Sequence, residues 1–439
     1  MTILTFVIEP GGAFCGRLRV PGDKSISHRA IMFGALAEGV TTITGFLEGE
    51  DCLATLNAFR AMEVRIDGPQ QSRVTVHGVG LHGLRRPSGP LDMGNSGTSM
   101  RLMSGLLAGQ SFDTILTGDI SLNRRPMQRV IEPLARMGAR IEATEQGTAP
   151  LRIYGDQRLT GIDYLLPVAS AQVKSCLLLA GLYADGLTCI TEPAPTRDHT
   201  ERMLQGFGYA LRCEDSRTVG ITGGGRLTGT AIDVPADISS AAFFLVGASI
   251  APGSDLLLEH VGVNPTRAGV IDILRLMGAA IEVLNPRLVG GEPVADLRVR
   301  HAPLHGIRIP EELVPLAIDE FPALFIAAAC AKGVTVLTGA QELRVKESDR
   351  LQVMADGLNA LGIAAGATSD GIVIQGGLLS GGTVNSHGDH RIAMSFAIAA
   401  LRADTPITVH DCANVKTSFP NFVTLIGHAG LKVVEQEVA

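Results

Sequence analysis

Lysine, arginine and hydroxyl side chains gather in a short polar cluster that precedes the first apolar segment of the chain. This cluster contains Lys24, Ser25 and Arg29. The free N–H groups at a helix N-terminus favour phosphate, and a Lys and a Ser hydroxyl would add a charge and a donor. A Ser N-cap with solvated Lys and Arg side chains is the structural alternative. Because cations at a helix N-terminus oppose the helix dipole, the cluster favours an anion site.

A second polar cluster, NSGT at residues 95–98, places a glycine among hydrogen-bonding side chains. Asn95 could cap a helix, and Gly97 would let a ligand approach the backbone closely. More basic residues follow along the chain: Arg124, Arg125, Arg344, Lys346, Arg350, Arg391 and Lys416. Guanidinium forks recognise phosphate and carboxylate groups well. The run RVKESDR at 344–350 can alternatively be a solvated helix face with i,i+3 and i,i+4 ion pairs.

Two carboxylates, Asp319 and Glu320, stand directly before the apolar segment FPALFIAAACA. A carboxylate there is a good helix N-cap. Asp319 is equally suited to accept a proton from a bound hydroxyl group as a general base. His387 and His390 lack neighbours that would complete a ligand set, so we predict no metal site.

One sequence pattern occurs six times along the chain. Each copy consists of a polar cluster, a small-residue apolar helix, a glycine and a β-branched strand, and a second helix separates successive copies. The copies are anchored at Lys24, Gly97, Gln172, Ser240, Asp319 and His390. Successive anchors are separated by 73, 75, 68, 79 and 71 residues. One copy is too small to bury a core, so we predict an α/β protein with three units per domain.

Two proline-containing segments, at residues 21–22 and 235–237, precede the first and fourth copies. They are the expected points at which the chain crosses between domains. Residues 23–238 would then form the first domain, and residues 1–22 with 239–439 the second. A consecutive split near residue 238, without a return crossing, is the alternative.

Composition narrows the class of protein. The chain has 439 residues, 46% of them hydrophobic, and no apolar run of about 18 residues that could cross a membrane. Its first residues, MTILTFVIEPGG, lack the basic region of a signal peptide. Seven cysteines without a CxxC motif indicate reduced thiols. The net charge of −7 argues against a nucleic-acid binder, so local basic clusters must hold any anionic substrate.

In its motifs the chain resembles the EPSP synthase family, the 3-phosphoshikimate 1-carboxyvinyltransferases. The motifs occur in order over essentially the whole length: PGDKSISHRA, GNSGTSMRL, LNRRPM, SAQVKS, TRDHTERML, AIDEFPALFIAAA, RVKESDRL and GDHRIAMSFAIAAL. The pair PGDKSISHR and RVKESDR is very specific. The resemblance implies two domains of three βαβαββ-like units each, forming an inside-out α/β barrel with the active site in the cleft between them.

The resemblance also implies a reaction. The enolpyruvyl group of phosphoenolpyruvate passes to the 5-hydroxyl of shikimate 3-phosphate through a tetrahedral addition–elimination intermediate, and phosphate is released. The product leads to chorismate and the aromatic amino acids. The family uses no metal and no organic cofactor. We expect a cytoplasmic, monomeric transferase whose partners are these two small molecules, without nucleic acid or membrane, and a target of the inhibitor glyphosate.

Residue roles follow from the matching motifs. Asp319 would accept the hydroxyl proton, Glu347 would donate and accept the proton at the methylene carbon, and Lys24 would stabilise charge on the bridging oxygen. The substrate-binding residues that the resemblance implies are Lys24, Ser25, Arg29, Asn95, Gly97, Arg125, Ser170, Gln172, Arg197, Asp319, Lys346, Arg350, Arg391 and Lys416. Among these, Asp319 and Lys346 would bind the shikimate hydroxyls, while Arg350 and Arg391 would bind phosphoenolpyruvate.

Two alternatives compete with this interpretation. The sister enzyme that transfers enolpyruvate to UDP-N-acetylglucosamine shares the fold, but it typically carries a loop Cys or Asp. The corresponding region here, residues 109–123, has no cysteine. A non-catalytic anion-binding repeat protein would not need carboxylates at Asp319 and Glu347.

Overall fold

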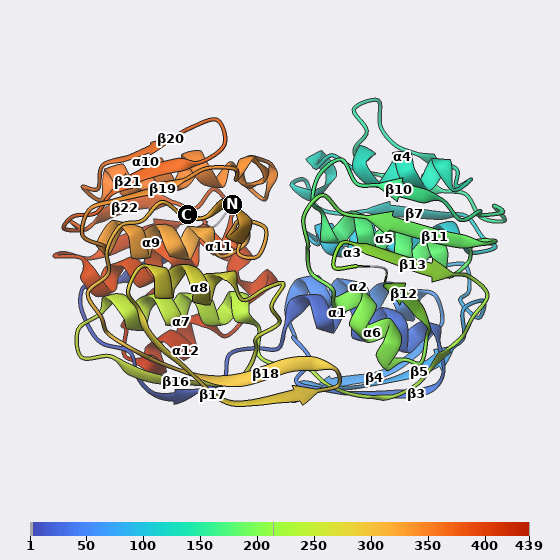
Figure 1. The fold of residues 1–439 in the computed structure, drawn as a ribbon, viewed down its shortest axis with the longest axis horizontal. Helices are drawn as coiled ribbons and strands as arrows, with labels where there is room; N and C mark the ends of the chain where they lie inside the picture. Colours follow the sequence, from blue (N-terminus) through green and yellow to red (C-terminus); the bar gives the residue numbers. More distant parts are fainter. Residues whose placement is uncertain (1–2, 214, 439) are drawn as a thin grey trace. The chain divides into compact units, whose positions relative to one another are not determined.

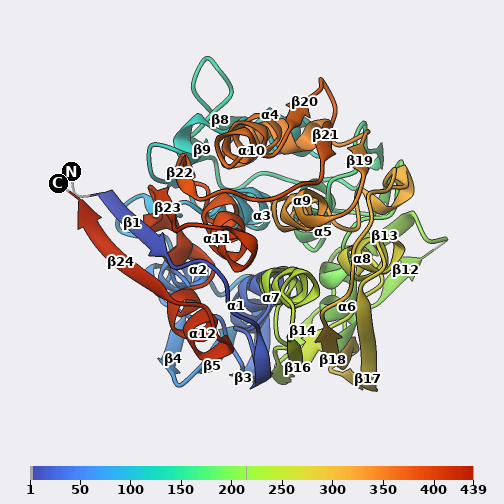
Figure 2. The ribbon, with the colours of Figure 1, turned by 90° about the vertical axis from the view of Figure 1, so that its left-hand side faces the viewer.

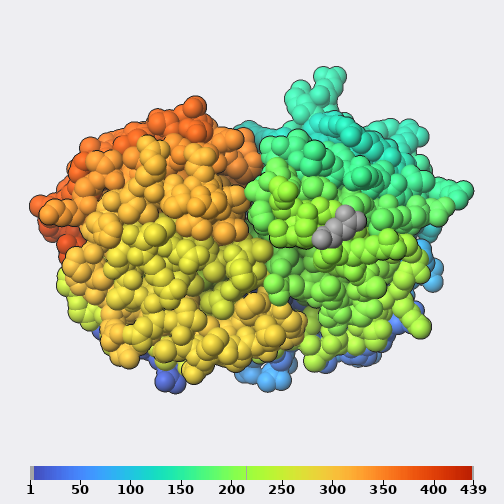
Figure 3. Space-filling model, in the orientation of Figure 1, coloured from blue at the N-terminus to red at the C-terminus, as the bar shows by residue number. Residues whose placement is uncertain are grey.

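The chain divides into two compact units. The computed structural model describes residues 3–213 and 215–438. Unit A consists of Gly22–Val234 and Val289–Gly291, and unit B consists of Met1–Pro21, Pro235–Leu288 and Glu292–Ala439. The chain passes from unit B to unit A after residue 21 and returns after residue 234. In the space-filling view, the cyan-to-green residues of unit A and the yellow-to-orange residues of unit B each form a continuous mass (Figure 3).

The described strands of unit A form three open sheets. Their strand orders are β14-β3-β5-β4, with β15 also paired to β3, then β6-β7-β9-β8, and β10-β11-β13-β12. The strands are β3 (Ala37–Thr44), β4 (Arg65–Gln70), β5 (Arg73–Val79), β6 (Leu91–Asp92), β7 (Thr114–Thr117), β8 (Ile141–Glu142), β9 (Leu151–Ile153), β10 (Asp163–Leu165), β11 (Leu187–Thr191), β12 (Leu211–Cys213), β13 (Thr218–Thr222), β14 (Leu227–Thr228) and β15 (Ala231–Asp233).

Inner helices of unit A are buried on nearly every side. They are α1 (Lys24–Leu36), α3 (Gly97–Ala108) and α5 (Ala171–Gly181). A helix that is apolar and small all round belongs in a core rather than at a surface. The outer helices, each with an exposed face, are α2 (Glu50–Ala61), α4 (Gln128–Arg136) and α6 (His199–Gly206), and the short helix η1 spans Leu122–Arg124.

The described strands of unit B also form three open sheets. Their orders are β22-β23-β1-β24, β17-β18-β16-β2 and β19-β21-β20. The strands are β1 (Ile3–Ile8), β2 (Cys15–Leu18), β16 (Asp255–Gly262), β17 (Ala280–Val289), β18 (Glu292–Arg300), β19 (Val334–Leu337), β20 (Ala365–Ala367), β21 (Ile372–Gln375), β22 (Gly382–Asn385), β23 (Ile407–His410) and β24 (Val433–Val438). Strand β1 runs antiparallel to both β23 and β24, which brings the two ends of the chain together.

Unit B encloses three inner helices, α7 (Ile238–Ile250), α9 (Phe321–Cys330) and α11 (His390–Ala399), which Figure 2 shows surrounded by its sheets. Every residue of α7 and α11 is buried. The remaining helices of unit B are α8 (Gly269–Leu276), α10 (Arg350–Ala360), α12 (Phe422–Ala429), η2 (Glu311–Leu313), η3 (Gln341–Val345), η4 (Ala400–Arg402) and η5 (Ala413–Thr417). Figure 1 labels most of the elements of both units.

Local sequence explains where the inner helices begin and end. Asp23 caps α1 by accepting a hydrogen bond from the Ile26 N–H at 2.8 Å, and Asp237 caps α7 through the Ser239 N–H. A glycine follows α1 and α9, as predicted: Gly39 is the third residue of β3, and Gly333 directly precedes β19. Both have φ of +97°, a value that side chains disfavour. After α11 the prediction is wrong, because no glycine lies between this helix and β23.

The fold is a mixed α/β fold, as the sequence predicts. The predicted inside-out barrel is more specific than the α/β fold class, and the sheets of the described residues do not support it directly. Each sheet has two open edges, and none closes on itself.

Candidate active site

At the N-terminus of α1, Lys24 is held against a carboxylate of the neighbouring helix. Its Nζ lies 3.0 Å from Asp51 Oδ2, and the Asp51 side chain is only 9% exposed. Ser25 is half-buried beside it. The pairing fixes the ammonium group at the end of α1, where the helix N–H groups also favour an anion.

Arg29 is buried under the same helix end and is fixed by three hydrogen bonds. Its Nε donates to Thr200 Oγ1 and its Nη2 to Ser175 Oγ, both at 2.7 Å, and its Nη1 donates to the Ser25 carbonyl at 2.9 Å. These contacts tie α1 to α5 and α6. Most of the guanidinium is therefore committed inside unit A, so Arg29 orders this end of the unit.

Gly97 opens α3 beside a second arginine. A Cβ on Gly97 would lie 3.2 Å from Arg125 Nη1 and 3.4 Å from Arg101 Nη1. Asn95 Oδ1 accepts a hydrogen bond from Arg125 Nη2 at 2.7 Å. Only a glycine leaves the guanidinium groups and the start of the helix in their present positions.

Arg101, which the sequence analysis did not select, joins α3 to α5. Its Nη1 donates to Gln172 Oε1 at 2.5 Å, and Gln172 Nε2 donates to Thr98 Oγ1 at 3.1 Å. Ser170 caps α5 through the Val173 N–H at 3.4 Å. Together with the contacts of Arg29, these bonds bring the N-termini of α1, α3 and α5 to one end of unit A. The available signal was an arginine inside an otherwise apolar helix, because a buried charge needs a partner.

A buried ion cluster anchors the segment that carries Arg197. Lys174 Nζ lies 2.7 Å from both Glu192 and Glu201, and its side chain is 3% exposed. Burial alone would lower the pKa of Lys174, but the two carboxylates raise it. Arg197 itself is half-buried between these anchored residues. The sequence pattern did not point to this cluster either.

In unit B, Asp319 faces two cations. Its Oδ1 lies 3.3 Å from Lys346 Nζ and 3.5 Å from Arg350 Nη1. Helix α9 begins at Phe321, and the side chain at its N-cap position makes no capping bond. Asp319 is therefore not the N-cap that the sequence left open, and its carboxylate is directed to the basic residues.

Arg350 is enclosed by carboxylates and is 1% exposed. Its Nε lies 2.8 Å from Asp389 Oδ2, and its Nη2 donates to Glu347 Oε2 at 2.7 Å. Burial alone would lower the pKa of Arg350, but Asp389, Glu347 and Asp319 raise it above its usual value. The residue-based alternative of a solvated helix face at 344–350 is wrong for this side chain, because α10 begins only at Arg350 and turns it inward.

Arg391 lies in the first turn of α11, also at this end of unit B. Its Nη1 donates to the Asp319 carbonyl at 3.0 Å. Asn414, on η5, donates to the Gly388 carbonyl at 2.6 Å and so brings η5 against the start of α11. Lys416 is exposed on η5. Unit B thus gathers Asp319, Lys346, Glu347, Arg350 and Arg391 at one end, with Lys416 on an adjacent segment.

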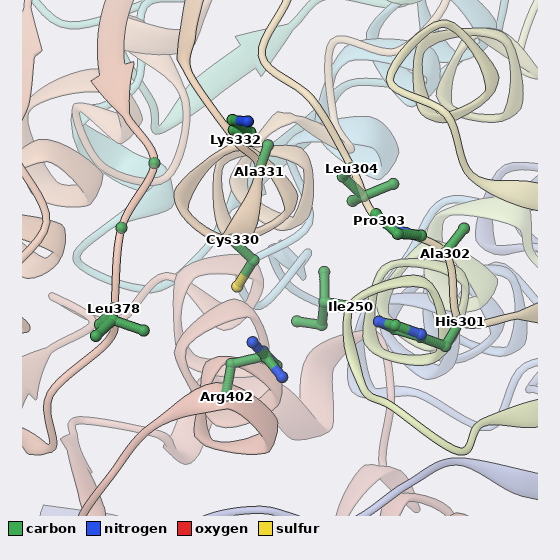
Figure 4. A pocket seen from close by; sticks show the side chains of 12 residues that line it. Ile250, His301, Ala302, Pro303, Leu304, Cys330, Ala331, Lys332, Leu378 and Arg402 are labelled. Atoms are coloured by element: carbon green, nitrogen blue, oxygen red, sulfur yellow. The ribbon is translucent and has the colours of Figure 1, made fainter.

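A pocket of about 440 Å³ lies elsewhere in unit B, at the C-terminal ends of α7 and α9. The Arg402 guanidinium and the Cys330 thiol point toward each other across it (Figure 4). Burial raises the pKa of Cys330 to about 12. Cations near helix C-termini offset the helix dipole, so the position of Arg402 has a structural explanation. None of the candidate site residues lines this pocket.

The described residues contain no group of three or more His, Cys, Asp or Glu side chains that could hold a metal ion. They also include no helix that is both long and apolar enough to span a membrane.

Comparison with known proteins agrees with this geometry. Residues 8–426 match the family described as EPSP synthase (3-phosphoshikimate 1-carboxyvinyltransferase). A 3-phosphoshikimate 1-carboxyvinyltransferase of Methylococcus capsulatus is 71% identical over 98% of both chains. One from Alkalilimnicola ehrlichii is 72% identical over 98% of this chain and 96% of its own.

A solved structure of EPSP synthase from Acinetobacter baumannii is 59% identical, covers 99% of this chain and 100% of its own, and superposes with a TM-score of 0.89. The family match and the full-length identity leave neither alternative favoured. The chain therefore belongs to the EPSP synthase family of enzymes, the 3-phosphoshikimate 1-carboxyvinyltransferases.

Proposed function

We propose that this chain transfers the enolpyruvyl group of phosphoenolpyruvate to the 5-hydroxyl of shikimate 3-phosphate and releases phosphate. The observation that carries the proposal is the arrangement of Asp319 and Glu347 around Lys346 and Arg350, in a chain that matches the family over its full length. The two carboxylates supply proton transfer, and the cations offset the charge of the substrates.

The addition step needs a base and an acid. Asp319 accepts the proton of the 5-hydroxyl, while the oxygen of that hydroxyl attacks C2 of phosphoenolpyruvate. Glu347, starting protonated, gives its proton to C3, which becomes a methyl group. The product is a tetrahedral adduct that still carries the phosphate. Proton-transfer groups of this kind contribute about 10²–10⁴-fold each.

The elimination step reverses the role of Glu347. Its carboxylate takes a proton from the C3 methyl group, the C2–C3 double bond forms again, and the C2–O bond to the phosphate breaks. The phosphate leaves with the electron pair of that bond, and Lys24 stabilises the charge on the bridging oxygen. Asp319 then returns its proton to the phosphate or to water.

Binding roles follow the two sets of cations. Phosphoenolpyruvate and shikimate 3-phosphate are both multiply anionic, and their repulsion must be offset at low effective dielectric. We assign Arg125, Arg350, Arg391 and the backbone of Gly97 to phosphoenolpyruvate. Shikimate 3-phosphate takes the remaining residues: Lys24, Ser25, Arg29, Asn95, Ser170, Gln172, Arg197, Asp319 and Lys346. Lys416 is assigned to the phosphate of phosphoenolpyruvate.

Units A and B are proposed to be the two domains, and each is proposed to contribute residues to the reaction. The three sheets and three inner helices described in each unit support the assignment of three βαβαββ-like units per domain. The inside-out barrel is proposed from the family resemblance. None of the seven cysteines, all within the described residues, forms a disulfide, which fits the proposed reducing cytoplasm. We also propose that the enzyme acts as a monomer.

Phosphate release from the purified protein tests the function. Shikimate 3-phosphate with phosphoenolpyruvate should give phosphate and an enolpyruvyl product of matching mass. UDP-N-acetylglucosamine in place of shikimate 3-phosphate should give neither. Turnover with the amino sugar, or none with either acceptor, would contradict the proposal.

A further inference from the structure

Buried charges join the first residues of the three inner helices of unit B. We call this set the Arg267 cluster, and its members are Asp237, Ser239, Arg267, Glu320 and Arg391. Arg267 is 3% exposed and Glu320 is 2% exposed. Charges at such depth are stable only when they are paired, so their partners determine where each side chain lies.

Arg267 lies at the centre of the cluster. Its Nη2 donates to Ser239 Oγ at 2.5 Å and to Asp237 Oδ1 at 3.2 Å. Ser239 Oγ in turn donates to Glu320 Oε1. The same oxygen of Glu320 lies 3.8 Å from Arg267 Nη2. Arg267 therefore neutralises Asp237 directly and Glu320 mostly through the hydroxyl of Ser239.

Glu320 is shared between two guanidinium groups. Its Oε1 lies 3.9 Å from Arg391 Nη1, a contact too long for a hydrogen bond. That nitrogen of Arg391 instead donates to the Asp319 carbonyl at 3.0 Å. Arg391 is thus held near Glu320 without a close ion pair. Two guanidinium groups balance the two carboxylates of the cluster.

We propose that Arg267 is a positioning residue that keeps Arg391 available to the anionic substrate. The inference rests on the proposed function, in which Arg391 binds phosphoenolpyruvate. Without Arg267, Arg391 would be the one guanidinium left within 4 Å of the Glu320 carboxylate among the described residues. An unpaired buried carboxylate is costly, so Glu320 would draw Arg391 into a direct ion pair and away from the substrate.

Steady-state kinetics of Arg267→Gln tests the inference. Truncating one partner of a buried charge pair is costly, so KM for phosphoenolpyruvate should rise by at least about tenfold. The turnover number and KM for shikimate 3-phosphate should change by less than about twofold, because binding lost equally from ground state and transition state changes KM alone.

The double variant Arg267→Gln/Glu320→Gln separates positioning from simple damage. Removing the Glu320 carboxylate, which would capture Arg391, should restore KM for phosphoenolpyruvate to within about threefold of wild type. In the double variant the side chains at positions 267 and 320 are both neutral, so neither is left as an unpaired charge. Arg275→Gln is the matched control. Arg275 is an exposed arginine of α8 that donates to the Ile281 carbonyl at 3.0 Å, and its loss should leave both KM values unchanged.

Three results would overturn the inference: an unchanged KM in Arg267→Gln, a rise of equal size for both substrates, or a rise that Glu320→Gln does not reverse. If circular dichroism shows that Arg267→Gln is unfolded, Arg267→Met with and without Glu320→Gln is judged by the same criteria. Methionine also lacks the charge, and its flexible apolar side chain adapts to irregular buried space. A wild-type protein without turnover would instead contradict the proposed function, so the two failures are distinguishable.

Discussion

Asp319 and Glu347 both lie against one buried guanidinium group. Arg350 lies 3.5 Å from Asp319 and 2.7 Å from Glu347, and Asp389 holds its other side. A planar fork with donors in fixed directions can orient several carboxylates at once. The proposed base and the proposed acid of the reaction therefore share one cation, and Lys346, 3.3 Å from Asp319, is a second cation beside the base.

Asp319→Asn and Glu347→Gln should each lower turnover by at least about 100-fold, because each removes a proton-transfer group. Both amides keep the size of the side chain they replace. Phosphate release under saturating substrates is the measurement. Asp356→Asn, which changes an exposed carboxylate of α10, should keep full activity. A loss below about tenfold in either of the two variants would reject that role.

Gly97→Ala should raise KM for phosphoenolpyruvate more than KM for shikimate 3-phosphate. The new methyl would lie 3.2 Å from Arg125 Nη1, so the guanidinium must shift by a few tenths of an ångström. Gly427→Ala is a suitable control, because a Cβ there meets nothing within 4 Å. Equal KM changes for both substrates would show that Gly97 is not specific to the phosphoenolpyruvate side.

Motifs in the sequence predicted many of the candidate site residues, but they did not predict how deeply each side chain is buried. RVKESDR suggests an exposed helix face from its charge alone, yet Arg350 is almost wholly buried. Arg101 and Lys174 lie within the motifs GNSGTSMRL and SAQVKS, and Arg267 lies outside all of the motifs. None of the three was predicted, because a single charge in a mainly apolar or loop segment does not reveal its partner. Their importance depends on partners that only folding brings together, such as Gln172 and Glu320.

At the scale of elements, a chain of polar side chains connects three helices of unit A. His28 Nδ1 lies 2.8 Å from Thr55 Oγ1, which lies 2.6 Å from Ser99 Oγ. These residues belong to α1, α2 and α3, respectively. Buried polar groups that satisfy one another fix the relative position of the helices. This hydrogen-bonded row of side chains therefore helps to place the end of α1 that carries Lys24 beside the end of α3 that carries Gly97.

Burial lowers the pKa of His28 well below 6.5, with smaller effects from Lys24 and Arg29. A histidine that stays neutral when folded binds fewer protons than in the unfolded chain, so stability falls as pH drops below about 6.5. Between pH 7 and pH 5 the wild type should lose about 2 kcal/mol more than His28→Gln, since one pKa unit is worth about 1.36 kcal/mol.

Urea unfolding at the two pH values measures this difference. His305→Gln, at an exposed histidine, is the control and should follow the wild type. Parallel losses in wild type and His28→Gln would show that His28 does not stay neutral in the folded protein.

Helices were easier to predict than sheets. Six anchors in the sequence all fall at or within three residues of the start of an inner helix, because capping residues and small apolar runs are local signals. Many strands of unit A have only two or three residues, as in β6 and β8. Strand order depends on pairing between distant segments, and these short strands carry too little pattern to reveal it.

At the scale of the whole molecule, the proposed reaction uses residues of both units, such as Lys24 of unit A and Asp319 of unit B. Closure on the substrates would exclude water and assemble the two sets of residues. Small-angle X-ray scattering of Asp319→Asn, which should not turn over, should show a smaller radius of gyration with both substrates than with inorganic phosphate alone. An unchanged radius would contradict closure.

The antiparallel pairing of β1 with β23 and β24 affects the order in which the two units fold during synthesis. Nearly all of unit A is one continuous segment, so it can fold as soon as residue 234 has left the ribosome. Strand β1 is made before unit A, yet its partners begin only at residue 407. Strand β1 must therefore wait, without these partners, until β23 and β24 have emerged, so unit B is completed only after the whole of the long unit A segment has been made.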